Sequence, residues 1–230
     1  LGSVAGDEAG LYTTPTSALS VVATNGFKAN GGAASVTVNV GGTAPGVGTY
    51  TLVDYDGTLG GGFGAFVLGT LPLRTIANLV DNAAGTSLDL NVTGVDSARW
   101  SGALSSSWTI ATQVAPKNWV LNSNGTTPTD FLASDAVHFT DTATSGIVTI
   151  DDADVTPSVV NVTNNTLAYQ IGGARAIAGG TSLSKSGAGT LSLNSANTSS
   201  GATTLAGGTT TFVNGALGTG AISFAGGSLS

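Results

Sequence analysis

Cysteine is absent from the 230-residue sequence, and this absence removes three kinds of chemistry. The chain has no disulfide bonds, no metal site with Cys ligands and no thiol nucleophile. An oxidising compartment permits disulfides but does not require them. The lack of cysteine is therefore compatible with secretion.

Charged residues are also scarce, at 8% of the sequence, against about 25% in a typical soluble domain. The net charge is −7, and the 6 Lys and Arg residues are scattered. This balance argues against binding to nucleic acid, whose phosphates require clustered basic residues, and against anionic membrane surfaces. Few Glu, Lys or Arg residues are present to cover an exposed helical face, so we do not expect helices.

Targeting and membrane-spanning segments are not visible in the sequence. It begins at Leu1 without a positively charged region followed by an apolar one, which a signal peptide would have. No apolar run is long enough to cross a bilayer as a helix. We expect both ends to be cuts through a longer protein, whose parent chain would carry the signal peptide.

Glycine and short alternating segments dominate what is present. The sequence holds 35 Gly, and 41% of its residues are hydrophobic, which argues against disorder. In Thr190–Leu193 and Ala221–Phe224 apolar and polar residues alternate. This period of two predicts β-strands, and the Gly pairs between them supply the positive φ angles of sharp corners. The sequence therefore predicts an all-β protein.

A repeat at the C-terminal end predicts that these strands stack as coils. The segment GGTSLS at Gly179 returns as GATTLA at Gly201 and again as GGSLS at Gly226. The second step along the chain is slightly longer than the first. A spacing of this size is typical of a solenoid, in which each coil buries its apolar face against its neighbours.

The same region resembles a known family. The matching segments are Lys185–Asn194 (KSGAGTLSLN), Ala196–Thr198 (ANT), Gly201–Leu205 (GATTL) and Ala216–Gly220 (ALGTG). Together they resemble the autotransporter-associated β-strand repeat, over about the last fifth of the chain. The resemblance implies a right-handed parallel β-helix in the passenger region of a secreted or outer-membrane-associated bacterial protein. It also implies a projecting or adhesive role, with neighbouring coils of the same long chain as partners.

We expect three parts along the chain: a β-solenoid tract over residues 1–94, a Trp-bearing capping or inserted segment over 95–150, and a β-helix tract over 151–230. In the first part the alternation predicts six strands, at residues 19–23, 35–40, 50–54, 63–68, 76–80 and 87–92. In the last part it predicts strands at 159–162 and 167–171. Residues expected in the interior are Val160, Val162, Leu191, Leu193, Leu205, Ile222 and Phe224.

All three tryptophans lie in the middle segment, at Trp100, Trp108 and Trp119. Large aromatic side chains could cover an open end of a coil stack, or they could form a platform on which sugar rings stack. We favour the cap, because aromatic residues usually dominate cores. The three tryptophans are nevertheless the candidate ligand-binding residues, with surface glycans as the ligand.

Three other patterns have a chemical interpretation and a simpler structural one. His138 is the only histidine and, with Asp135 and Asp141 nearby, could ligate a metal, but a solvated strand histidine is the simpler interpretation. Gly60–Gly62 resembles a phosphate loop but lacks the following Lys, so we expect a corner. The carboxylates of Asp151, Asp152 and Asp154 could bind Ca²⁺ or serve a polysaccharide lyase, but a solvated turn is the default interpretation.

The sequence thus predicts a non-catalytic structural rod, without cofactor, metal site or membrane insertion. The alternatives are a carbohydrate-binding adhesin that uses the tryptophans and, less favoured, a β-helix enzyme that cleaves polysaccharides. Fold alone does not choose among these functions.

Overall fold

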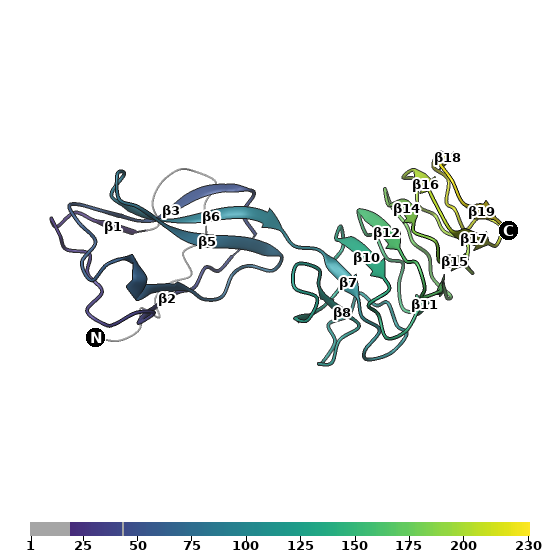
Figure 1. The fold of residues 1–230 in the computed structure, drawn as a ribbon, viewed down its shortest axis with the longest axis horizontal. Coiled ribbons are helices and arrows are strands. Elements are labelled where there is room, and N and C mark those ends of the chain that lie inside the picture. The colour runs from purple at the N-terminus through teal and green to yellow at the C-terminus, as the bar shows by residue number, and fades with distance from the viewer. Residues whose placement is uncertain (1–18, 43) are drawn as a thin grey trace. The chain divides into compact units, whose positions relative to one another are not determined.

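The computed structural model describes residues 19–42 and 44–230, and the chain divides into two compact units between Asp96 and Ser97 (Figure 1). Strands make up 40% of the described residues and helix only 1%. The predicted all-β class is confirmed. We call residues up to Asp96 unit 1 and residues from Ser97 unit 2, and describe each by itself.

Within residues 19–42 and 44–96, unit 1 contains six strands and one short 3-10 helix. Their bounds are β1 Leu19–Val21, β2 Val36–Val38, β3 Gly48–Tyr55, η1 Phe63–Ala65, β4 Phe66–Leu68, β5 Thr75–Asn82 and β6 Ser87–Val95. One strand falls in each of the six segments where the alternation predicts one. The part of the predicted tract before residue 19 lies outside the described residues.

In the described part of unit 1, the coils that stack lie within residues 19–68. Strand β1 pairs in parallel with β3, β2 pairs in parallel with β4, and Lys28 bridges to Gly60 between them. Strands β5 and β6 instead run antiparallel to each other, and β6 runs antiparallel to β3. The solenoid expected over residues 1–94 is therefore interrupted. Alternation predicts a strand but not its direction, and the turn closed by the Gly85 N–H donating to the Asn82 carbonyl reverses the chain.

Unit 2 contains the remaining thirteen strands. They are β7 Ala98–Trp100, β8 Trp119–Leu121, β9 Pro128–Thr129, β10 Ala136–Thr140, β11 Ile147–Thr149, β12 Val159–Thr163, β13 Tyr169–Gly172, β14 Ser182–Ser186, β15 Thr190–Leu193, β16 Thr203–Leu205, β17 Thr209–Phe212, β18 Ile222–Phe224 and β19 Ser228–Leu229.

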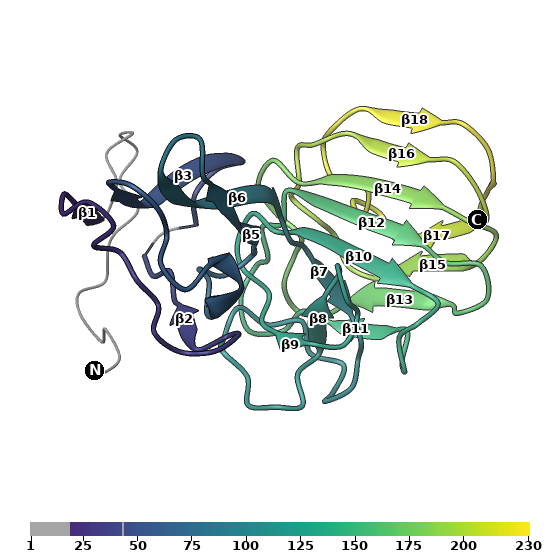
Figure 2. The same cartoon turned by 60° about the vertical axis from the view of Figure 1, so that its left-hand side comes forward.

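These strands form two long sheets that wind up a β-solenoid of about four turns. One sheet has the order β18-β16-β14-β12-β10-β7-β8-β9, and we call it the eight-stranded sheet. The other has the order β11-β13-β15-β17-β19, and we call it the five-stranded sheet. From β10 to β18 every neighbouring pair in the eight-stranded sheet is parallel, and Figure 2 shows these strands as successive layers.

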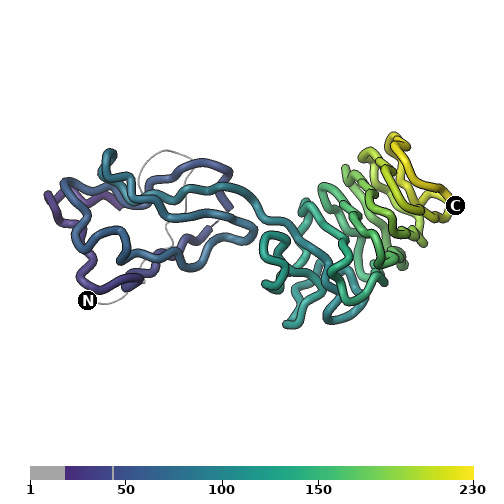
Figure 3. Tube along the Cα trace, in the orientation of Figure 1, coloured from purple at the N-terminus to yellow at the C-terminus, as the bar shows by residue number. Residues whose placement is uncertain are grey.

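The coils shorten toward the C-terminus. One column of the eight-stranded sheet runs through Val137, Val160, Leu183, Thr203 and Ile222, each paired in register with the next. The first two steps along this column are equal, and each later step is shorter than the one before it. The tube in Figure 3 follows these coils one after another toward the C-terminus.

The predicted return of the repeat at Gly226 is wrong. An added Cβ at Gly226 or Gly227 would meet backbone atoms of residues 206–208, which places these glycines over Gly207 and Gly208 rather than over Gly201. The error arises because Gly pairs mark several corners of each coil, so matching letters do not identify the same corner.

One corner of the coil requires glycine. Gly187 has φ +80° and Gly208 has φ +69°, values in the left-handed region that other residues rarely adopt. A Cβ at Gly187 would also collide with the carbonyl oxygen of Asn164 in the coil below. Close stacking of coils therefore depends on the missing side chain at this corner.

A single hydrophobic core runs through unit 2 and includes the tryptophans as well as the coils. Val160, Val162, Leu191, Leu193 and Leu205 are all at most 2% exposed, as predicted for interior positions. Ile222 and Phe224 are exposed, and the prediction of burial is wrong for these two residues. Both residues lie on β18, the last strand of the eight-stranded sheet.

Candidate functional site

The N-terminal end of the solenoid is closed by a cluster of aromatic rings. Trp100 on β7 faces Trp119 on β8, with ring centroids 5.1 Å apart and planes at 80°. Trp108, from the loop between these strands, packs edge-on against Trp119 at 5.3 Å and against Phe131 at 5.4 Å. Phe139 contacts all three indoles at 5.6–6.0 Å. Edge-to-face pairs of this kind add to the stabilisation from apolar burial.

The three indoles lie inside this cluster. Trp100 and Trp108 are 0% exposed and Trp119 is 1% exposed. The Trp100 Nε1–H donates to the Ser145 carbonyl at 2.9 Å, whereas the Nε1 atoms of the other two have no hydrogen-bond partner. The favoured interpretation as a cap and core fits this geometry. The tryptophans offer no face on which a sugar ring could stack unless the core opens.

Asn118 holds the loop that carries Trp108, and the sequence did not single it out for this role. Its Oδ1 accepts hydrogen bonds from the backbone N–H groups of Leu104 and Ser105 at 3.0 and 2.7 Å. Its Nδ2 donates to the Ser107 carbonyl at 2.8 Å. An amide can satisfy several backbone groups at once, but nothing in a single Asn beside a Trp predicts this.

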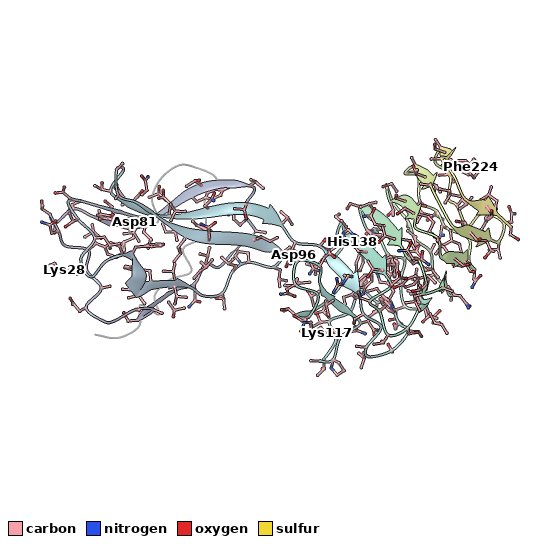
Figure 4. All side chains as sticks on the ribbon, in the orientation of Figure 1. Lys28, Asp81, Asp96, Lys117, His138 and Phe224 are labelled. Carbon is pink, nitrogen blue, oxygen red and sulfur yellow. The ribbon has the colours of Figure 1, made fainter. Side chains whose placement is uncertain are left out.

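An ion pair and a proline complete the closed end. The Lys117 ammonium, labelled in Figure 4, lies 2.5 Å from the Asp130 carboxylate. The outermost strand of the eight-stranded sheet at this end is β9, which has only two residues and begins with Pro128. Short edge strands and proline are common means of preventing a further strand from pairing.

Asp151, Asp152 and Asp154 lie at a bend between β11 and β12. Two of them accept hydrogen bonds from backbone N–H groups of the next coil. Asp151 accepts a hydrogen bond from the Ala174 N–H, and Asp154 accepts one from the Ala176 N–H, both at 3.0 Å. Asp152 is exposed. Over residues 19–42 and 44–230, no group of three or more His, Asp or Glu side chains is arranged to hold a metal ion. The hydrogen bonds that Asp151 and Asp154 accept agree with the interpretation of this cluster as a turn.

Asp141 has the same capping role at another corner. The N–H groups of Leu167, Thr166 and Asn165 donate to its carboxylate at 2.9–3.0 Å. These hydrogen bonds lower the pKa of Asp141 to about 2, because they favour the ionised form. The carboxylate thus ties one coil to the next.

The two remaining patterns are His138 and the glycine run Gly60–Gly62. His138 is half-buried on β10, where it stands in register with Arg99 on β7 and Asn161 on β12 (Figure 4). Gly60 bridges to Lys28, and Gly61 and Gly62 have φ +82° and +77°. The helix that follows them has only three residues. The predicted corner at Gly60–Gly62 is confirmed.

A lysine lies inside the stack, although the sequence did not indicate its burial. Lys185 on β14 is 0% exposed, and its ammonium donates to the carbonyls of Ser186, Gly187 and Gly207 at 2.9–3.3 Å. The first two carbonyls belong to its own coil and the third to the next. Burial lowers the pKa of Lys185, an effect that the charge of Asp141 partly opposes. The ammonium joins two coils at the glycine corner.

The C-terminal end of the solenoid is open. Ile222 and Phe224 on β18 pair in register with Thr203 and Leu205, which are 3% and 2% exposed. Ile222 is 43% exposed and Phe224 is 58% exposed. On β19, Leu229 is 46% exposed, although the residue in register with it is 1% exposed. These side chains occupy interior positions that no further coil covers, and we call them the open-end residues.

Comparisons with known proteins do not identify a family. No family model, no curated protein and no solved structure matches the chain. Among the residues that the structure describes, no helix is long and apolar enough to cross a membrane.

Proposed function

We propose that this chain is a non-catalytic structural segment of a secreted or cell-surface bacterial protein, similar to the passenger regions of autotransporters. Its role is to extend and support the parent protein as a rod. The observation that carries the proposal is the continuous parallel pairing from β10 to β18, in which each coil is hydrogen-bonded to the next. Such a stack can grow by whole coils without changing the contacts of the existing ones.

The use of the polar side chains supports this role. Asp141, Asp151 and Asp154 accept hydrogen bonds from backbone N–H groups one coil later, and Lys185 donates to backbone carbonyls. These groups maintain the spacing of the coils and are not directed into a common cleft. The resemblance of Lys185–Gly220 to the autotransporter-associated repeat supports the location at the cell surface.

Removing one whole coil tests the structural role. Leu183 is in register with Thr203, so deletion of residues 183–202 joins equivalent positions of two coils. We expect a folded chain with a cooperative unfolding transition and a solenoid shorter by one strand spacing of about 4.8 Å. Deletion of residues 183–192 is the matched control. It joins a position in one sheet to a position in the other, and we expect it to abolish folding of the C-terminal coils.

Labelling of intact cells tests the location. An antibody raised against this chain is applied to the bacterium that encodes it, before and after permeabilisation. The proposal predicts labelling of intact cells, and labelling only after permeabilisation would contradict it. Turnover of a polysaccharide by the purified chain would contradict the non-catalytic role.

A further inference from the structure

One row of polar side chains points outward from the eight-stranded sheet, across the strands from β7 to β16. Each member stands in register with the next, and the row consists of Arg99, His138, Asn161, Ser184 and Thr204. All five are half-buried, and the residues on either side of them along each strand face the core. Because neighbouring strands lie about 4.8 Å apart, the row offers one polar group at each such step. We call it the polar row, and Figure 2 shows the strands that carry most of it side by side.

Most of the polar row is not used by the fold. Among the residues that the structure describes, the side chains of Asn161, Ser184 and Thr204 make no hydrogen bond with another protein group. The corner residues Asn164 and Asn197, by contrast, donate to carbonyls of a neighbouring coil at 2.9 and 2.6 Å. Amide and hydroxyl groups each supply donors and acceptors. The outer face of the sheet therefore presents unused hydrogen-bonding groups in a regular line.

Arg99 is a charged member of this row that lacks a partner. Within residues 19–42 and 44–230 its guanidinium makes no hydrogen bond or ion pair, and its Nε is buried without an acceptor. Other cations of unit 2 are paired, since Lys117 contacts Asp130 and Lys185 donates to three carbonyls. A buried donor left without an acceptor costs about 1–3 kcal/mol. An anionic group that binds the Arg99 guanidinium would supply the missing acceptor.

The strands that carry the polar row contain no carboxylate. No Asp or Glu occurs in β7, β10, β12, β14 or β16. The carboxylates nearest in sequence to β10 belong to Asp135 and Asp141, and both accept hydrogen bonds from backbone N–H groups. An anionic ligand thus meets the Arg99 charge on a face whose strands carry no opposing carboxylate, although the chain as a whole has a net charge of −7. Charge complementarity on this face favours an anion.

The remaining groups of the face favour a polyhydroxylated ligand over a protein. No Trp, Tyr or Phe points outward from β10, β12, β14 or β16, because Phe139 is buried in the core. Protein partners usually bind through aromatic anchors in addition to Arg. Sugar hydroxyls both donate and accept hydrogen bonds, as the amide of Asn161 and the hydroxyls of Ser184 and Thr204 do. A carboxylate on the sugar can pair with the guanidinium of Arg99 in a charge-assisted hydrogen bond.

We propose that the outer face of the eight-stranded sheet binds a linear polysaccharide of uronic acids. A carboxylate of the polymer pairs with Arg99, and its hydroxyls hydrogen-bond along Asn161, Ser184 and Thr204. The sugar chain lies across the strands, parallel to the direction in which the coils stack. The inference concerns binding without cleavage, uses none of the tryptophans and does not depend on the rod function proposed above.

Isothermal titration calorimetry of the 230-residue chain with oligogalacturonate tests the inference. We expect binding, and no binding of the same oligomer with its carboxylates methyl-esterified. Arg99→Gln should weaken binding about tenfold or more, the effect of losing a hydrogen bond to a charged group. Arg175→Gln is the matched control, because it removes the same charge from an exposed residue outside the two sheets. Its affinity should equal that of the unmodified chain.

A second variant covers the case in which Arg99→Gln perturbs the fold, as judged by near-UV circular dichroism. Asn161→Asp places a carboxylate within the polar row and should also weaken binding about tenfold. Asn214→Asp makes the same change at an exposed corner residue and should have no effect. Failure to bind oligogalacturonate, equal binding of the methyl ester, or unchanged affinity in Asn161→Asp would overturn the inference. So would amide NMR shifts on titration that affect residues 192 and 211 of the five-stranded sheet instead of residues 161 and 184.

Discussion

The two ends of the unit 2 solenoid differ in how the last coil is finished. At the N-terminal end, antiparallel strands and the rings of Trp100, Trp108 and Trp119 cover the core. At the C-terminal end, Phe224 and Leu229 lie in the same kind of inward position but are exposed. Strands with the same alternation of inward and outward positions can thus differ in burial. What differs is the cover, which the closed end obtains from residues outside the repeat.

The largest expected effect comes from opening the closed end. Trp119→Ala removes a ring that contacts Trp100, Trp108, Phe131 and Phe139. We expect unit 2 to lose about 3–5 kcal/mol of unfolding free energy, the usual range for a buried Trp replaced by Ala. Denaturant unfolding followed by near-UV circular dichroism measures this change. Phe224→Ala at the open end is the control, and its effect should stay within about 0.5 kcal/mol for the monomer. Equal effects at both ends would contradict the comparison.

A matched pair of leucines sharpens the comparison within one column of the solenoid. Leu191 pairs with Thr210 and Thr210 pairs with Leu229, so the two leucines occupy the same position two coils apart. Leu191 is 0% exposed and Leu229 is 46% exposed. We expect Leu191→Ala to destabilise the chain by about 2–5 kcal/mol because it leaves a cavity. Leu229→Ala should change stability by less than about 1 kcal/mol in the monomer.

The next effect concerns the lysine that joins two interior coils. Lys185→Met keeps an unbranched side chain but leaves three backbone carbonyls without their donor. We expect a loss of about 1–3 kcal/mol, the usual penalty for buried groups left unsatisfied. Equilibrium unfolding in urea measures it. A variant more stable than the unmodified chain would show that burying the ammonium costs more than its hydrogen bonds contribute.

The smallest effect is a pH dependence at the Asp141 corner. The pKa of this carboxyl is lowered from 3.8 to about 2 in the folded chain, so its ionised form favours folding. Its contribution is complete above pH 3.8 and is lost as the pH falls through about 2. Asp141→Asn should therefore weaken the dependence of the unfolding midpoint on pH in this acid range. The same pH dependence in Asp141→Asn and in the unmodified chain would contradict this role of the carboxylate.

The sequence predicts the strands and much of the interior but not the ends. Alternation placed Val160, Val162, Leu191 and Leu193 inside because burial on one face is a local property of a strand. It placed Phe224 inside for the same reason, but burial there depends on a neighbouring coil. The antiparallel return of β5 and β6 and the true partner of Gly226 were also missed. Strand direction and register depend on contacts that are distant in sequence.

The candidate sites likewise depend on contacts that are distant in sequence. Their residue types were visible, but their partners were not. The tryptophans could be named, yet their burial depends on Asn118 holding the loop and on Phe139 from the next coil. The acidic cluster could be assigned to a turn, whereas its acceptance of N–H groups about one coil later required the stacked structure.

Hydrogen exchange along unit 2, measured at a dilution where the chain is a single copy, tests the central claim most directly. A solenoid closed at one end and open at the other predicts that amides of residues 98–100 and 137–139 exchange last and that those of residues 222–230 exchange first. Protection of residues 222–230 equal to that of residues 137–139 at this dilution would contradict an open end. Rapid exchange of residues 98–100 would contradict a closed one.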